Sequence, residues 1–197
     1  DDFKFLPAMI ERLNITSVHQ PRKVDLCQQG EAGDRSFNVM HELLTLLDSL
    51  KFQGTVVIHG NNFDELNSDK LQHIKLLADR VNRLRGAVST EIKIAFETDV
   101  AFFNLINSNR ALLVYPEDFN MLSSYLTFPI NIVLDFEHIY ISAIFRRFIK
   151  DDPDQYKSVL SSDELGSADT PAIKDAWLNY LSLHKADIGS YVRELLD

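Results

Sequence analysis

The sequence predicts an α/β protein of the (β/α)8 TIM-barrel type, complete or reduced, with parallel strands inside and helices outside. Two observations lead to this fold class. First, short β-branched or aromatic runs recur about every forty residues with helix-like sequence between them, which is the pattern of successive βα units. Second, each run ends in a side chain that can bind a metal or move a proton. The runs are Ile15–His19, Thr55–His59, Ile92–Glu97 and Pro129–Asp135.

Composition is that of an ordinary globular protein and predicts one domain over residues 1–197. The 197 residues are 45% hydrophobic, which is enough for one sizeable core. The single cysteine excludes an intramolecular disulfide and a cysteine-rich zinc site, and it suits a reducing cytoplasm. No uninterrupted apolar run is long enough for a membrane span, so no membrane partner is expected. The net charge of −9 argues against a large nucleic-acid surface, although a local basic groove or bound metal can offset it.

The first part of the chain alternates helical and extended patterns. Apolar residues at helical spacing occupy residues 3–14, and a strand is expected near 15–18. Asp34 is the expected cap of an amphipathic helix that runs to Leu50. The strand over 55–58 is continuously apolar, which is typical of a strand buried on both faces.

The middle of the chain repeats this alternation. Ser68 or Asp69 is expected to open a helix that Gly86 ends, with a basic face that includes Arg80 and is interpreted as solvated. A strand over 92–96 follows. Pro116 and the acidic residues after it predict a short helix over 117–126, before a strand near 130–134. The remaining segments are a strand or loop at 111–115, a helix or strand at 139–148, a polar loop at 151–169, helices from 170 and from 188, and an ambiguous 181–184.

The side chains at the strand ends are the candidate functional residues. The carboxyl ends of parallel strands lie on one side of a sheet, so these side chains are expected to share one pocket. The set consists of His19, His59, Glu97, Asp135 and, one helical turn after the aspartate, His138. A lone histidine is more often structural than functional, and it is the regular placement that favours a shared site. His41 and His73 lie inside expected helices and are interpreted as surface residues.

A set of imidazoles and carboxylates offers nitrogen and oxygen ligands together. Such a field suits a divalent metal such as Zn, Mn, Co or Fe and leaves Mg open. Carboxylates can also bridge two ions. A metal in this site can lower the pKa of bound water for hydrolysis, or polarise a sugar carbonyl for isomerisation.

Four segments together resemble the xylose isomerase-like barrels, a family that includes endonuclease IV, the ultraviolet-damage endonucleases, and sugar isomerases and epimerases. Ser17-Val-His19-Gln-Pro, followed by Val24-Asp-Leu26, is similar to the family's second-strand histidine segment. Val56-Val-Ile-His59-Gly resembles its third-strand histidine, and Ile94-Ala-Phe-Glu97 its fourth-strand glutamate. Leu134-Asp135-Phe-Glu-His138 resembles its Asp-x-x-His motif.

The resemblance implies roles for individual residues. Glu97 and Asp135 would be the central metal ligands, and His59 would bind a second metal or hold substrate. His19 and His138 could serve either role, and His184 would stand for the seventh-strand histidine. Glu97, His59 and His138 are the residues expected to take part in catalysis. The family's eighth-strand glutamate has no convincing counterpart in this sequence.

Three functions remain open from the sequence. The first is a sugar isomerase or epimerase acting on a sugar or sugar phosphate, which fits the second-strand segment and the acidic charge. The second is a metal-dependent endonuclease that repairs damaged or abasic DNA, since the same ligands can generate a hydroxide beside a phosphodiester. The third is a degenerate, non-catalytic barrel used as a binding module, which the missing glutamate would explain.

Overall fold

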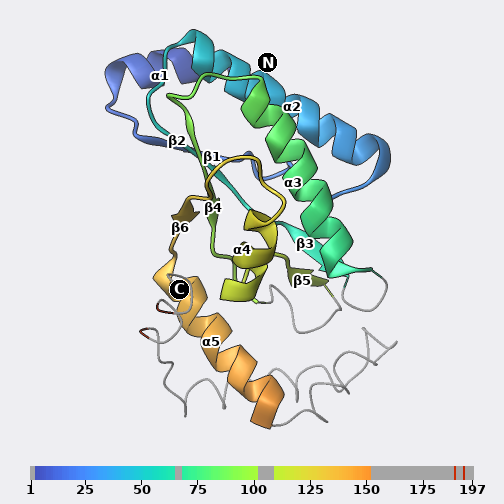
Figure 1. Ribbon diagram of the computed structural model, residues 1–197. Coiled ribbons are helices and arrows are strands. Elements are labelled where there is room, and N and C mark those ends of the chain that lie inside the picture. Colours follow the sequence, from blue (N-terminus) through green and yellow to red (C-terminus); the bar gives the residue numbers. More distant parts are fainter. Residues whose placement is uncertain (1–2, 65–67, 102–108, 152–188, 190–192, 194–197) are drawn as a thin grey trace, which may run out of the picture.

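The computed structural model describes residues 3–64, 68–101 and 109–151, together with the single residues 189 and 193. These residues form a mixed α/β structure (Figure 1). Its helices are α1 (Leu6–Arg12), α2 (Gly30–Ser49), α3 (Lys70–Gly86), α4 (Pro116–Ser123) and α5 (Phe136–Asp151). Its strands are β1 (Ser17–His19), β2 (Thr55–Ile58), β3 (Asn62–Asp64), β4 (Lys93–Glu97), β5 (Asn109–Ala111) and β6 (Ile132–Val133).

Four strands make a parallel sheet in the order β1-β2-β4-β6. The expected strands near 15–18, 55–58, 92–96 and 130–134 are therefore present and parallel, and their neighbours in the sheet follow their order along the chain. This is the arrangement of consecutive βα units. An α/β fold is confirmed, whereas the described residues show an open sheet of four strands and not a closed barrel of eight.

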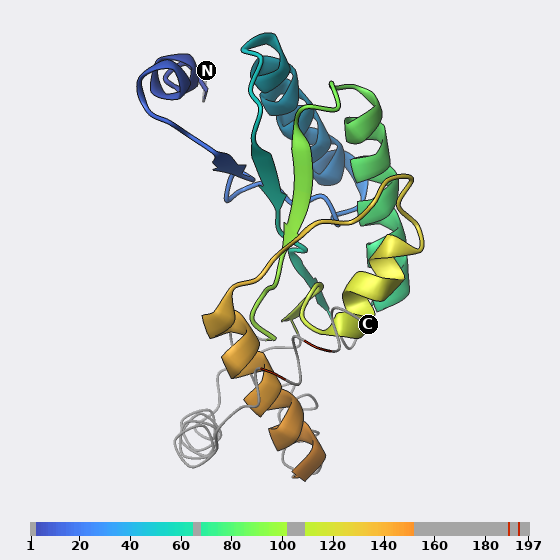
Figure 2. The same ribbon diagram turned by 60° about the vertical axis from the view of Figure 1, so that its left-hand side comes forward.

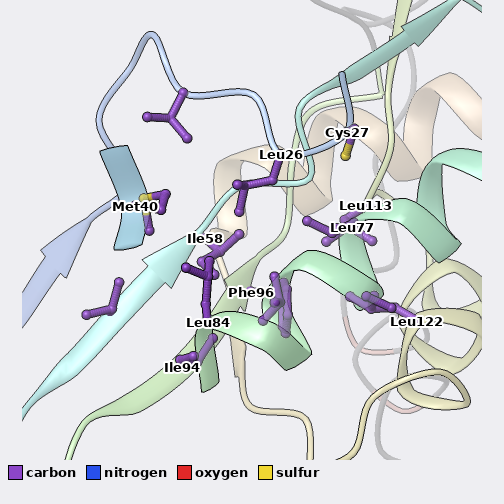
Figure 3. Packing of buried hydrophobic residues seen from close by; sticks show 14 of the residues in the cluster. Leu26, Cys27, Met40, Ile58, Leu77, Leu84, Ile94, Phe96, Leu113 and Leu122 are labelled. Atoms are coloured by element: carbon purple, nitrogen blue, oxygen red, sulfur yellow. The ribbon is translucent and has the colours of Figure 1, made fainter. Parts of the chain in front are cut away.

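The helices α2, α3 and α4 cover one side of this sheet, and α1 stands apart beyond the edge strand β1 (Figure 2), with its partly buried Leu6 and Ile10 packed against the main core. The main core lies between the sheet and these three helices (Figure 3). Alternate residues of the two central strands enter it, for example Ile58 from β2 and Phe96 from β4, both fully buried. Because side chains alternate along a strand, the residues between them point to the opposite face.

The helix starts follow the capping rules in one case and depart from the expectation in another. The side chain of Asp69 accepts a hydrogen bond from the backbone nitrogen of Leu71 at 2.9 Å, so Asp69 caps α3 as expected. The expected cap Asp34 is wrong, because α2 already begins at Gly30. Gly30 has a φ of +66°, a value that glycine tolerates and that lets the chain turn into the helix earlier.

The expectation of a solvated basic face on α3 is wrong for Arg80. Its side chain is buried, and its guanidinium donates hydrogen bonds to the backbone carbonyls of Leu26 (2.8 Å) and Gln28 (2.5 Å). A buried guanidinium requires such acceptors, and the loop between β1 and α2 supplies them. Gly33 of α2 packs against the same group, where an added Cβ would clash with the carbonyl oxygen of Gln28.

The last described elements extend the fold beyond the sheet. The segment 139–148, left open between helix and strand, is part of the helix α5 that follows β6. β3 and β5 form a separate antiparallel pair that the sequence did not predict. The expected helices from 170 and from 188 fall in a region of which only residues 189 and 193 are described. None of the helices in the described part of the chain is long and apolar enough to cross a membrane.

Candidate metal centre

Strand register places the candidate ligands on the face of the sheet that the core helices do not cover. Ile58 of β2 pairs with Phe96 of β4, so the next residues, His59 and Glu97, follow at the same level. The chain alternates, so both side chains point away from Ile58 and Phe96 and hence away from the core. His19 ends the neighbouring strand β1 one step earlier, where it pairs with Val57.

Glu97 is the centre of the cluster. Its Oε2 lies 3.4 Å from Nδ1 of His19 and 3.4 Å from Nε2 of His59. The glutamate is only 8% exposed, whereas the side chain of His19 is 52% exposed and lies at the rim. The three residues therefore present two ring nitrogens and one carboxylate oxygen to a common point.

Asp99 contacts the other side of the His59 ring. Its Oδ1 lies 3.5 Å from Nδ1 of His59, and its Oδ2 accepts a hydrogen bond from the backbone nitrogen of Gly60 at 3.1 Å. Hydrogen bonding to Asp99 is the largest cause that raises the pKa of His59 above its usual value. The charges of Asp99 and Glu97 act in the same direction, and burial of the ring opposes them.

A second group extends the cluster towards α5. Glu97, Asp135 and His138 each bring one ligand atom within 4.8 Å of the others. Nδ1 of His138 lies 2.7 Å from the carbonyl oxygen of Thr98, which can only accept, so Nδ1 carries the proton and Nε2 keeps its lone pair.

Asp135 combines two roles. Its Oδ1 accepts hydrogen bonds from the backbone nitrogens of Glu137 (2.9 Å) and His138 (3.2 Å), which is the pattern of a helix N-cap at the start of α5. Its Oδ2 lies 3.8 Å from Nδ1 of His138. The capping contacts fix the carboxylate while leaving Oδ2 for a ligand.

The cluster fits a divalent cation because of one buried atom. Oε2 of Glu97 accepts no hydrogen bond from any residue that the structure describes, although it is shielded from solvent. A buried carboxylate oxygen without a donor is costly, and a bound cation is one way to compensate it. The surrounding donors are imidazole nitrogens and carboxylate oxygens, the ligands expected for Zn, Mn or Co.

A pocket of about 370 Å³ opens beside this cluster. It lies between His59 and Asp99 on one side and the loops that follow β1 and β2 on the other. The lining residues are Gln20, Pro21, Arg22, His59, Asn61, Asn62 and Asp99.

Two amide side chains hold these loops together. Nε2 of Gln20 donates to the carbonyl of Val24 (2.8 Å) and to Oδ1 of Asn61 (3.1 Å). Asn61 in turn donates to the same carbonyl at 3.0 Å, from a backbone with a φ of +59°. The wall of the pocket is therefore built from ordered, mostly uncharged polar groups.

The structure brings together all the expected ligands that it describes. His19, His59 and Glu97 form one group, and Glu97, Asp135 and His138 form the other. His184 lies outside the described residues. Of the other two histidines, His41 is exposed as expected, while His73 is half-buried with Nδ1 3.2 Å from the carbonyl oxygen of Cys27.

Sequence reasoning missed Asp99, Thr98, Gln20 and Asn61. A signal for Asp99 was present, because Glu97 and Asp99 are two residues apart at the end of a strand and so point to the same face. Gln20 directly follows His19, and Asn61 comes two residues after His59. Only the folded chain shows that their two loops lie against each other.

No protein-family model matches this sequence, and no curated protein matches it. The arrangement of its own side chains therefore carries the functional argument.

Proposed function

We propose that this protein is a divalent-metal-dependent enzyme of the sugar isomerase or epimerase type, built on a barrel of the xylose isomerase-like kind. The observation that carries the proposal is the buried Oε2 of Glu97, which lies between two histidine nitrogens and accepts no hydrogen bond from the described residues. When bound, a metal would polarise a carbonyl oxygen and its neighbouring hydroxyl. Glu97 with His19 and His59 would hold one ion, and Glu97 with Asp135 and His138 a second.

The pocket favours a small substrate. Its volume of about 370 Å³ lies within the range of roughly 300–1,000 Å³ that small-molecule sites occupy. Gln20, Asn61 and Asn62 offer amide groups to hydroxyls, and Arg22 adds a cation that can meet a phosphate. These groups support a sugar or a sugar phosphate, bound next to His59.

Metal-dependent cleavage of damaged or abasic DNA is the second candidate. It is favoured by the sharing of Glu97 between two groups, because a carboxylate that bridges two ions suits in-line attack on a phosphodiester. The net charge of −9 and the small volume of the pocket weigh against it. A duplex needs many cationic contacts, whose counterion release makes binding fall steeply with salt.

One set of assays separates these functions. Purified protein is loaded in turn with Mn, Co, Zn and Mg, and its metal content is measured after removal of excess ion. Each form is then incubated with pentoses, hexoses and their phosphates, and in parallel with an abasic duplex. The proposal predicts bound metal and metal-dependent conversion of a sugar. Cleavage of the duplex without sugar turnover would replace it with the repair function, and an absence of bound metal would overturn both.

A further inference from the structure

Asp99 belongs to neither group of candidate ligands, yet it is among the most enclosed charged residues of the site. It lies two residues after Glu97, is 5% exposed, and is fixed by a backbone hydrogen bond to the carbonyl of Leu113 at 2.9 Å. A carboxylate in such a position must find donors or a cation. Its Oδ2 accepts the backbone N–H of Gly60 at 3.1 Å, and its Oδ1 faces the ring of His59 at 3.5 Å.

These contacts bear on which nitrogen of the neutral His59 ring carries the proton, because each ring nitrogen faces a carboxylate. Oδ2 of Asp99 accepts the backbone N–H of Gly60, and Oδ1 faces Nδ1 of His59 at 3.5 Å. An ionised carboxylate accepts hydrogen bonds and donates none, and the neutral ring has one N–H to share between Asp99 and Glu97, whose Oε2 lies 3.4 Å from Nε2. A cation held by Glu97 requires the lone pair of Nε2, and the ring proton then lies on Nδ1, where Asp99 accepts it.

We propose that Asp99 is a positioning residue that holds His59 in the tautomer with Nδ1 protonated, so that Nε2 is the ligating atom. The inference rests on the proposed metal site, for which it supplies the outer partner of a metal-binding histidine. Such partners fix the orientation and tautomer of the ring and strengthen it as a ligand. By also holding the backbone of Gly60, Asp99 restrains the residue that follows the histidine.

The same logic applies on the other side of Glu97. The carbonyl of Thr98 orients His138 through Nδ1, as Asp99 orients His59. The tripeptide Glu97-Thr98-Asp99 thus supplies the shared ligand and the groups that orient a histidine of each ligand group. One strand end organises the whole cluster, because successive residues point in different directions.

The variant Asp99→Asn tests the role of the carboxylate at nearly constant volume. An amide has one acceptor atom for two donors. If its oxygen keeps the buried N–H of Gly60, its NH₂ group faces Nδ1 of His59 and forces that nitrogen to accept. The ring then carries its proton on Nε2, pointing at Glu97. We expect the tautomer to invert and the affinity for Mn or Zn to fall by about 10- to 100-fold.

The tautomer is determined from the NMR chemical shifts of the ring nitrogens of His59, measured in metal-free protein at alkaline pH. The signals of His59 are identified by their loss in the variant His59→Gln. This measurement needs no metal and no substrate. Metal affinity is measured separately by titration. Asp25→Asn is the matched control, because Asp25 also accepts a backbone N–H, from Cys27 at 2.8 Å, but contacts no candidate ligand.

The outcomes separate the inference from the proposed function. A protonated Nδ1 in the wild type, inverted in Asp99→Asn and unchanged in Asp25→Asn, supports the inference. A wild-type ring protonated on Nε2 overturns it even if the variant fails to fold, and so does a folded Asp99→Asn with an unchanged tautomer. The expected tautomers without any metal binding would leave Asp99 as the residue that sets the tautomer of His59, and would remove both the ligating role of Nε2 and the proposed enzyme.

Discussion

Replacing Glu97 by glutamine is expected to remove metal binding from the whole cluster, because Glu97 alone belongs to both groups of ligands. The substitution keeps the volume and removes the anionic ligand. Metal-free protein should be as stable as the wild type or more so, since the change removes a buried charge whose Oε2 has no hydrogen bond among the described residues. Asp135→Asn should remove only the group with His138, because asparagine caps a helix about as well as aspartate.

The size of the effect follows from linkage. Metal present at about 100 times its Kd stabilises a native state with one site by roughly 2.7 kcal/mol. For a domain of this length, that corresponds to a rise in Tm of about 5–11 °C. We expect a rise of at least this size in the wild type, none in Glu97→Gln, and a remaining rise in Asp135→Asn from the group of His19 and His59.

The assay is thermal unfolding with and without Mn or Zn for these proteins and for Glu137→Gln. Glu137 is exposed, adjacent to the cluster and in neither group, so this control should shift like the wild type. An equal metal-induced shift in the wild type and in Glu97→Gln would refute the reasoning. It would mean that the ion binds elsewhere on the chain.

Three further outcomes are expected. Gly33→Ala should lower the free energy of unfolding in urea by about 1–3 kcal/mol, because its Cβ would meet the carbonyl of Gln28; a change below about 0.5 kcal/mol would contradict the packing. Burial is the chief reason that the pKa of Cys27 is raised well above its usual value, and its thiol donates a hydrogen bond to the carbonyl of Gly60. Cys27 should therefore resist alkylation until the protein unfolds, and rapid labelling of the native protein would be inconsistent with this. The pKa of Asp25 is raised chiefly by burial, so its ionisation costs stability as the pH rises through and above its usual pKa of 3.8. Asp25→Asn should therefore gain stability relative to the wild type over that range. A relative loss of stability in urea titrations would contradict this expectation.

The sheet could be predicted because its strands are short, rich in β-branched and aromatic residues, and evenly spaced. The continuously apolar Val56-Val57-Ile58 predicts a strand that is buried on both faces, and the polar residue after it marks the strand end. Even spacing then aligns the strand ends, which is why His59 and Glu97 come to the same level. That inference needs only the chain order of the strands, and their order in the sheet follows it.

The remaining features depend on contacts between segments distant in sequence. Arg80 lies among basic residues on its helix, and only the approach of the loop carbonyls of Leu26 and Gln28 makes it a buried donor. Asp99 reads as an ordinary loop aspartate until His59 and Gly60 are placed beside it. The periodicity of the sequence predicts which face of an element a side chain occupies, but it does not predict which residue that side chain will contact.

Metal binding and turnover are separable in this fold. Both candidate ligand groups lie within β1, β2, β4 and the junction of β6 with α5, so the proposed ions can be held without a further strand. By the resemblance, the isomerases draw a base from an eighth-strand glutamate, for which this sequence has no convincing counterpart. A degenerate barrel would therefore keep the metal-dependent rise in Tm and lose sugar conversion, because its ligands are supplied independently of that base. Loss of both would instead mean that the cluster around Glu97 does not bind metal. Only the combination of bound metal and a converted sugar supports the proposed enzyme.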